Sequence, residues 1–192
     1  DHYSEIKYII RDSDNSGLHN AQLGAIHAIS AIDTLGRKKQ IVTMPTGSGK
    51  TAVLMMTPFV LRSIRALVLT PSRIVADQIA EEFESLATLK RIGVLADSLT
   101  NPIVAKQRNR VVSLDQWAQL KESDVVVTTP QCISPEYKDV VAPPTDVFDL
   151  ILVDEAHHSP ARTWNAILNI FLDAKHILFT ATPFRRDKKE IQ

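Results

Sequence analysis

The sequence has 192 residues, of which 44% are hydrophobic and 23% charged, and it therefore suits one globular domain with a proper core. Its 22 lysines and arginines balance its 22 aspartates and glutamates, which excludes nucleic-acid binding through net charge and leaves only local patches for it. The single cysteine, Cys132, excludes a disulfide framework, and the apolar runs are too short to cross a bilayer. With no signal peptide at residues 1–4, we expect a soluble protein without a membrane partner, cytoplasmic or, in a eukaryote, nuclear.

Short apolar runs alternate with stretches of helical periodicity along the chain. We expect residues 1–17 to be an N-terminal extension and residues 18–192 to be one domain. In the first half of the chain, the expected elements are a helix from the cap Asn20 to Gly36, a strand at 41–43, a helix at 50–63, a strand at 65–70 and a helix at 74–89. In the second half, they are a short helix at 114–120, a strand at 125–128 with a short helix after it, a strand at 150–153, a helix at 161–172 and a strand at 177–180. Strands that alternate with helices pair in parallel, so we expect an α/β fold with a mostly parallel central sheet and helices on both faces.

Parts of this pattern are less regular. Pro58 lies inside helix 50–63 and is expected to kink it or to split it in two. The stretch between residues 90 and 123 is the hardest to interpret, and its apolar run at 92–95 is a candidate strand. Pro143 and Pro144 are expected in a surface loop.

The sequence MPTGSGKT at residues 44–51 predicts a phosphate-binding loop, because it lies between an expected strand and an expected helix. Its glycines let backbone N–H groups curl around a polyphosphate, and the next helix points its partial positive end at the same phosphates. Met44 stands where the common pattern has glycine. The residues expected to hold the nucleotide are Pro45, Thr46, Gly47, Ser48, Gly49, Lys50 and Thr51, with Lys50 reaching the terminal phosphates and Thr51 ligating Mg²⁺.

A pair of carboxylates, Asp154 and Glu155, follows the apolar run at 150–153, so a buried strand delivers them to its carboxyl end. We expect Asp154 to hold Mg²⁺, through water, and Glu155 to orient and deprotonate the attacking water. Both serve one site only if the strand gives way to a turn there; the alternative is that they merely cap the next helix. His157, which we group with Lys50 and the two carboxylates as catalytic, is expected to bond to another loop and to report the phosphate state, with a metal site as the alternative.

The order of these motifs resembles the first RecA-like domain of a superfamily-two helicase or translocase, of the DEAH-bearing kind related to restriction-enzyme motor subunits. The matching segments are 44–51 for motif I, 67–73 for motif Ia, 128–130 for motif Ib, 154–157 for motif II and 180–187 for motif III with its restriction-like tail. The family tolerates residues other than glycine at the position of Met44. The resemblance implies a three-layer RecA-like fold that binds ATP and Mg²⁺.

The resemblance also implies residue roles outside the phosphate loop. It assigns nucleic-acid contacts to Pro71, Ser72, Arg73, Thr129 and Pro130, and coupling between the two sites to Thr180, Ala181 and Thr182. Arg73 has a simpler alternative, which is a surface ion pair with Asp77 one helical turn on. Gln22 stands where the family has a glutamine that recognises adenine, and the alternative is a solvated glutamine at the start of a helix.

A motor of this family needs a second RecA-like domain, which supplies an arginine finger and which we expect outside this chain. The parent protein is then a nucleic-acid-stimulated ATPase, a helicase or translocase, acting on DNA in preference to RNA. We expect the domain alone to be monomeric, to bind ATP and Mg²⁺ weakly and to hydrolyse ATP very slowly, because losing such an arginine costs roughly 10³–10⁵ in turnover. The alternatives are a non-catalytic, nucleotide-gated binding module and another phosphate-loop protein, such as a transporter ATPase or a signalling GTPase.

Overall fold

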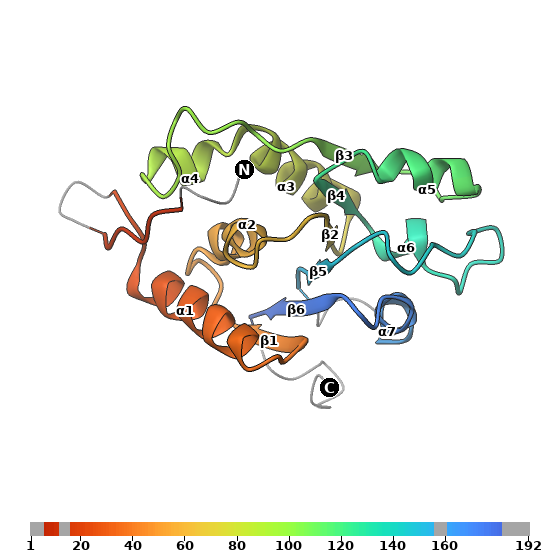
Figure 1. Cartoon of the computed structure of the whole chain (residues 1–192), viewed down its shortest axis with the longest axis horizontal. Coiled ribbons are helices and arrows are strands. Elements are labelled where there is room, and N and C mark those ends of the chain that lie inside the picture. The colour runs from red at the N-terminus through yellow and green to blue at the C-terminus, as the bar shows by residue number, and fades with distance from the viewer. Residues whose placement is uncertain (1–5, 12–15, 156–160, 182–192) are drawn as a thin grey trace.

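The computed structural model describes residues 6–11, 16–155 and 161–181, and strands alternate with helices through this part of the chain (Figure 1). The strands are β1 (Lys39–Thr43), β2 (Ala66–Leu69), β3 (Val104–Gln107), β4 (Val125–Thr128), β5 (Leu150–Val153) and β6 (Lys175–Thr180). The helices are α1 (Asn20–Thr34), α2 (Lys50–Val60), α3 (Arg73–Ser85), α4 (Ala87–Arg91), α5 (Leu114–Leu120), α6 (Pro130–Ile133) and α7 (Ala161–Ile170). None of these helices is long and apolar enough to cross a membrane.

The strands form one sheet in which every neighbouring pair is parallel, in the order β1-β6-β5-β2-β4-β3. At the carboxyl ends of the strands, Thr43 pairs with Thr180, and Leu69 pairs with Val153 on one side and Thr128 on the other. Because parallel strands end at the same edge of a sheet, the loops that follow them meet there. The predicted α/β class with a parallel central sheet is confirmed.

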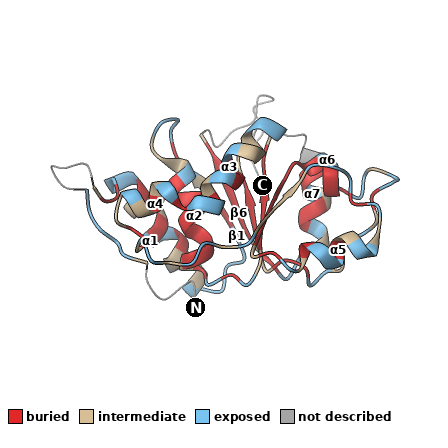
Figure 2. Cartoon of the chain, turned by 90° about the horizontal axis from the view of Figure 1, so that it is seen from above, coloured by how far each residue is buried: buried red, intermediate tan, exposed pale blue. Residues whose placement is uncertain are grey.

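Helices cover both faces of the sheet, and Figure 2 shows the sheet between them. Successive strand side chains point to opposite faces, so each face has its own apolar core. One core lies between helices α1–α4 and the sheet and includes Ile26, Val53, Phe59, Val68, Phe83, Leu89, Val127, Leu152 and Phe179. The other core lies between helices α5–α7 and the sheet and includes Leu67, Trp117, Val126, Cys132, Ile151, Trp164, Phe171 and Leu178. These two cores make the three-layer architecture.

Two helices differ from the predicted pattern. The expected helix at 74–89 is two helices, α3 and α4, because Leu86 between them has a left-handed backbone with φ 52° and a fully buried side chain. Pro58 does not split α2, which continues two residues beyond it to Val60. A proline removes the hydrogen bond of its own N–H, and this loss is tolerated here because the helix ends within the same turn. The Pro58 carbonyl accepts from the Ser63 N–H at 2.9 Å as the chain leaves the helix.

The less regular stretch also differs from the prediction. Residues 92–95 are not a strand but the turn after α4, where the Val94 carbonyl accepts from the Lys7 N–H at 2.8 Å. Edge strand β3 escaped prediction because Val104–Gln107 contains no apolar run, and all four residues are only half-buried. Pro143 lies in the predicted loop before β5 but is buried there. At the start of α1, the cap is His19 rather than Asn20.

Candidate nucleotide-binding site

The loop between β1 and α2 has the backbone shape of a phosphate-binding loop. Gly47 and Gly49 have φ 79° and 78°, a left-handed conformation that residues with a Cβ rarely adopt. A Cβ on Gly47 would meet nothing within 4 Å, whereas a Cβ on Gly49 would lie 2.1 Å from Nε2 of Gln22. The Ser48 N–H and hydroxyl both donate to the Pro45 carbonyl, at 3.2 and 2.6 Å, and close the loop. Gly49 caps α2, so the N-terminus of this helix faces the loop.

The first residue of the loop is tied to the neighbouring strand. The Met44 side chain is buried in the core, and its N–H donates to the Thr180 carbonyl at 3.0 Å. Thr180 is fully buried at the end of β6, and Ala181 follows it half-buried. Two of the three predicted coupling residues therefore lie directly beside the phosphate loop, while Thr182 lies outside the described residues.

Lys50 is held by the two carboxylates that follow β5. Its Nζ lies 3.3 Å from Oδ1 of Asp154 and forms an ion pair with Oε1 of Glu155. The side chains of Lys50, Asp154 and Glu155 are only 13%, 11% and 24% exposed. Charges this far from water require such partners, because removing one of them would leave the other charge buried and uncompensated. The structure thus brings Lys50 together with a pair of residues that lies 105 positions later in the sequence at Glu155.

Both carboxylates reach this site because the chain turns where β5 ends. The Asp154 N–H continues the strand pairing and donates to the Leu69 carbonyl at 2.8 Å. Glu155 has φ 49°, in the left-handed region, so the extended chain does not continue and its side chain stays beside Asp154. The expected turn is confirmed. The alternative that the pair caps the next helix stays an alternative, because residues 156–160, between the pair and α7, lie outside the described residues. His157 lies outside the described residues.

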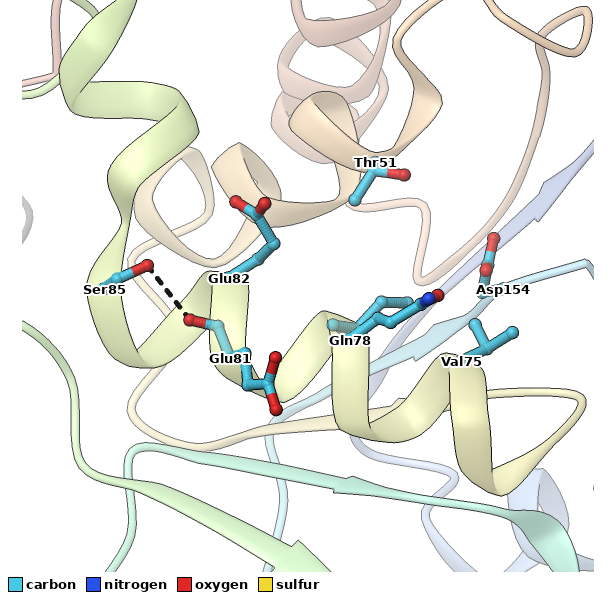
Figure 3. A pocket seen from close by; sticks show the side chains of 8 residues that line it. Thr51, Val75, Gln78, Glu81, Glu82, Ser85 and Asp154 are labelled. Atoms are coloured by element: carbon cyan, nitrogen blue, oxygen red, sulfur yellow. Dashed lines mark hydrogen bonds between the residues drawn. The ribbon is translucent and has the colours of Figure 1, made fainter.

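Thr51 and Asp154 both line one cavity of about 500 Å³ beside the phosphate loop. Figure 3 shows the two side chains on one side of this cavity and α3 on the other, with Gln78, Glu81 and Glu82. Hydroxyl and carboxylate oxygens are the ligands that Mg²⁺ prefers, so this donor set fits the predicted ion. No arginine is among the described residues that line the cavity.

Gln22 is buried against the phosphate loop, so it is not the solvated glutamine of the alternative interpretation. Its Nε2 donates to the Gly49 carbonyl at 3.2 Å, and its Oε1 accepts from the His19 N–H at 2.9 Å. A smaller cavity of about 200 Å³ lies beside it and is lined by Arg11, Gly17, His19, Gln22, Ala52, Thr88 and Ile92. Gln22 thus borders a space next to the loop, and its role towards adenine stays a prediction.

The predicted nucleic-acid residues of motif Ia lie at the start of α3. Ser72 caps this helix, since its hydroxyl accepts from the Val75 N–H at 3.3 Å. Arg73 is exposed beside it. Asp77 binds Arg108 at 2.9 Å, so the alternative in which Arg73 pairs with Asp77 is wrong. No sequence pattern indicated Arg108, which lies 31 residues from Asp77.

The other predicted contacts are more enclosed. Thr129 and Pro130, at the start of α6, are both buried, and the Thr129 hydroxyl lies 3.5 Å from Sγ of Cys132. The hydroxyl is therefore turned into the protein. Pro71, between β2 and α3, is half-buried.

The loops at the carboxyl edge fall into two groups because of the strand order. The first group follows β1, β6 and β5 and contains the phosphate loop, residues 180–181 and the carboxylate pair. The second follows β2 and β4 and contains residues 71–73 and 129–130. Each set of predicted residues is therefore contiguous along the edge.

Comparison with known proteins shows which family this chain resembles. Residues 15–185 match the family model described as type III restriction enzyme, res subunit. A protein of the Sulfolobus islandicus filamentous virus (isolate Iceland/Hveragerdi), named as a proposed helicase, number 22, is 22% identical over 198 residues, which cover 99% of this chain and 32% of the viral protein. The DEAD-box ATP-dependent RNA helicase 1 of Oryza sativa subsp. japonica is 32% identical over 107 residues, which cover 46% of this chain and 20% of the rice protein. The chain thus spans about a third of the viral relative's length.

Solved structures share the fold. The UvsW helicase of bacteriophage T4 has a TM-score of 0.57 at 15% identity, covering 92% of this chain and 57% of that one. The S. cerevisiae protein dbp5, bound to nup159, gle1, ip6 and adp, has a TM-score of 0.50 at 20% identity, covering 86% of this chain and 47% of that one. These likenesses confirm the predicted RecA-like helicase fold. Because the family model covers most of its length, the chain belongs to the type III restriction enzyme, res subunit family, as a RecA-like domain of superfamily-two helicase type.

Proposed function

We propose that this chain is the ATP-binding half of a nucleic-acid-dependent ATPase motor, which hydrolyses ATP to move along or unwind nucleic acid. The observation that carries the proposal is the cluster of Lys50, Asp154 and Glu155 beside a glycine loop of phosphate-binding shape. Family membership implies an ATP hydrolase. Three of the four residues expected to be catalytic, Lys50, Asp154 and Glu155, are in contact, which disfavours a binding module without catalysis.

In this proposal, ATP binding exchanges the partners of Lys50. The ammonium group leaves the carboxylates and donates to phosphate oxygens, while backbone N–H groups of the loop and the start of α2 bind the same phosphates. Thr51 and Asp154 would hold Mg²⁺, which neutralises charge on the phosphoryl group that is transferred. Glu155, released from Lys50, orients the attacking water and takes its proton. His157, two positions after Glu155 in the sequence, would report the phosphate state.

The domain alone is expected to hydrolyse ATP slowly. The cavity beside Thr51 and Asp154 offers no arginine among its described lining residues. A positive charge near the transferred phosphoryl group is worth roughly 10³–10⁵ in turnover in comparable enzymes. We therefore propose that a second RecA-like domain of a longer parent protein supplies that charge. The chain covers only part of its relatives' lengths, which supports a longer parent.

Nucleic acid is proposed to bind at the second group of loops, which follows β2 and β4. Exposed Arg73 and the start of α3 can donate to phosphate oxygens without reading sequence. The description of the family as a restriction enzyme supports DNA as the track. The rice relative is named as an RNA helicase, so the choice needs a direct test.

Calorimetric titration of ATP into the 192-residue chain, with and without Mg²⁺, tests the nucleotide half of the proposal. The wild-type chain should bind ATP, and Lys50→Ala should bind at least about tenfold more weakly, because a charge-assisted hydrogen bond contributes about 1.5–3 kcal/mol. Lys38→Ala removes an equally charged side chain from the amino end of β1 and should leave binding unchanged. Equal affinity of the wild-type chain and Lys50→Ala would refute the proposed site.

A further inference from the structure

A third cavity lies between α1 and β1, the first strand in the sheet order (Figure 1). Its volume is about 390 Å³, and of residues 44–51 only Met44 and Pro45 line it. Aliphatic side chains form most of its wall, and no charged residue is among the described residues that line it. Small-molecule sites in proteins have volumes of roughly 300–1,000 Å³ and walls of this apolar kind. The cavity therefore has the size and the surface of a ligand site.

The cavity exists because the side chains of α1 that line it are small. Ala21, Gly24 and Ala28 follow one another at helical spacing, and all three are exposed. A Cβ on Gly24 would meet nothing within 4 Å, so the space above this residue is open. Among Lys, Arg, Asp and Glu, α1 contains only Asp33, although the outer face of a surface helix is normally charged. This face of α1 is therefore suited to contact an uncharged, apolar molecule.

The wall on the side of β1 contains one polar group that lacks a partner. Gln40 is only 6% exposed, and its Nε2 donates to the Ile29 carbonyl at 3.3 Å. Its Oε1 is buried and has no hydrogen-bond partner among the described residues. Turning the amide over does not help, because its oxygen would then face the Ile29 carbonyl. An unpaired buried acceptor is unfavourable, so this wall offers an acceptor to a hydrogen-bond donor that reaches it.

We propose that this cavity binds an uncharged, largely apolar small molecule with one hydrogen-bond donor, and that Gln40 accepts from that donor. The apolar body of the ligand lies on Gly24 and Ala28, and burial of its apolar surface supplies most of the affinity. Oε1 of Gln40 is covered in this structure, so the amide has to turn towards the donor as the ligand binds. This turn is easy because the terminal torsion of a glutamine side chain has a broad minimum. The inference needs neither ATP nor nucleic acid and is independent of the proposed function.

Two polymer occupants compete with a small molecule. β1 lies at the end of the sheet order, and the free N–H and C=O groups of an edge strand can pair with a further strand. Such a strand would come from a second copy of the chain or from the longer parent protein. It would pair with the backbone of β1 and would need no donor for Gln40. A small molecule fits better, because the unpaired oxygen belongs to a side chain in the wall of the cavity.

The test follows the amide signals of the isotope-labelled 192-residue chain by heteronuclear NMR while indole is added. Indole is uncharged and aromatic and has one N–H donor, and benzofuran has the same shape with an oxygen atom in place of this N–H. Indole should shift the signals of α1 and β1 until they saturate, with a dissociation constant of about 1 mM or tighter. Benzofuran should bind at least about fivefold more weakly, because it keeps water from Gln40 and provides no donor.

Matched variants locate the site. Gly24→Leu places a side chain in the cavity without a clash and removes a glycine from a helix interior, so it should fold and abolish saturable binding of indole. Ala31→Leu adds the same kind of side chain to α1 outside the cavity and should leave indole binding unchanged. Gln40→Leu keeps an apolar wall without the acceptor, so indole and benzofuran should bind this variant with equal affinity.

Several results would overturn the inference. The first is the absence of saturable shifts in α1 and β1, and the second is equal affinity of the wild-type chain for indole and benzofuran. If the 192-residue chain binds indole and the longer parent does not, a segment of the parent occupies the cavity instead. If the wild-type chain sediments as a dimer that indole dissociates, the occupant is a second copy. None of these results bears on the proposed function, which the titration with ATP tests separately.

Discussion

The side-chain nitrogen of Gln22 lies 3.2 Å from the carbonyl oxygen of Gly49, so a residue 27 positions earlier in the sequence holds the phosphate loop. The oxygen of the same amide accepts from the His19 N–H at 2.9 Å. One buried side chain therefore joins the start of α1 to the start of α2. The shape of the loop depends on this contact as well as on its glycines.

Alanine at position 49 should disturb this contact, whereas alanine at position 47 should not. Both glycines have a left-handed backbone, which costs roughly 1–2 kcal/mol for a residue with a Cβ. Only the Cβ of Gly49→Ala would lie 2.1 Å from Nε2 of Gln22, because that of Gly47→Ala enters open space. We expect Gly49→Ala to lower the free energy of unfolding in urea by about 1 kcal/mol more than Gly47→Ala does.

A chain that carries Gln22→Ala supplies the control for this comparison. In that background the clash is gone, so the two alanine variants should lose similar stability. Equal losses in the wild-type background would contradict the proposed contact between Gln22 and the loop.

A second prediction concerns Arg65, which lies just before β2, at the edge of the sheet where the strands begin, and bonds to residues 121–123 and to Val147. Its guanidinium donates to the carbonyls of Ser123 at 3.0 Å, of Val147 at 2.9 Å and of Lys121. Arg65→Ala removes all three charged donors, so we expect the free energy of unfolding to fall by about 2–4 kcal/mol. Arg65→Lys should recover only part of this loss, since one ammonium group cannot reach three carbonyls with the geometry of a planar fork.

Arg37→Ala is the matched control for Arg65, because Arg37 is an exposed arginine between α1 and β1. Its loss of stability should stay within about 0.5 kcal/mol. If urea unfolding gave the same small loss for Arg65→Ala, the three carbonyl contacts would not be stabilising.

The features predicted from the sequence are those with a local signature. Strands β2, β4 and β5 are continuous apolar runs, and the phosphate loop is a contiguous pattern between a strand and a helix. The meeting of Lys50 with Asp154 followed from the rule that parallel strands end at one edge. Each of these inferences needed only a short stretch of chain and a general rule of α/β folds.

The features that escaped prediction depend on distant residues or lack a local signal. Strand β3 is polar and half-buried, so its residues carry no apolar pattern. The break at Leu86 was hidden because an apolar residue at helical spacing normally continues a helix, whereas here a left-handed backbone buries it. The Arg108–Asp77 pair joins residues 31 positions apart, and nothing in either segment identifies the other.

A third prediction concerns pH and His176, a buried residue at the start of β6. Burial lowers the pKa of this imidazole below its ordinary 6.5, although its contact with the Phe171 carbonyl partly opposes the shift, and Lys39 and Lys38 lower it further. Below pH 6.5 the unfolded chain therefore binds a proton that the folded protein does not bind. In this range the free energy of unfolding should decrease as the pH is lowered, by at most about 1.4 kcal/mol per pH unit. Above pH 6.5 this histidine should contribute no pH dependence.

His176→Gln should remove this pH dependence between about pH 7.5 and pH 5 while the rest of the chain titrates as before. The lowered pKa values of Asp139 and Asp146, which face Arg110 and Lys121, do not interfere in this range. Their stabilisation is present above their ordinary pKa of 3.8 and is lost only below it. An unchanged pH dependence in His176→Gln, measured by urea unfolding, would assign the effect to another group.

The central claim is that this chain is half of a nucleic-acid-stimulated ATPase, and the most direct test is the steady-state ATP turnover of the longer parent protein. Single- and double-stranded DNA and RNA would be added in turn. We predict strong stimulation by one of these polymers, with DNA favoured, and its loss in Glu155→Gln, which cannot accept the proton of the attacking water. Flat turnover with every polymer, despite measurable ATP binding, would contradict the motor and would favour a nucleotide-gated binding module.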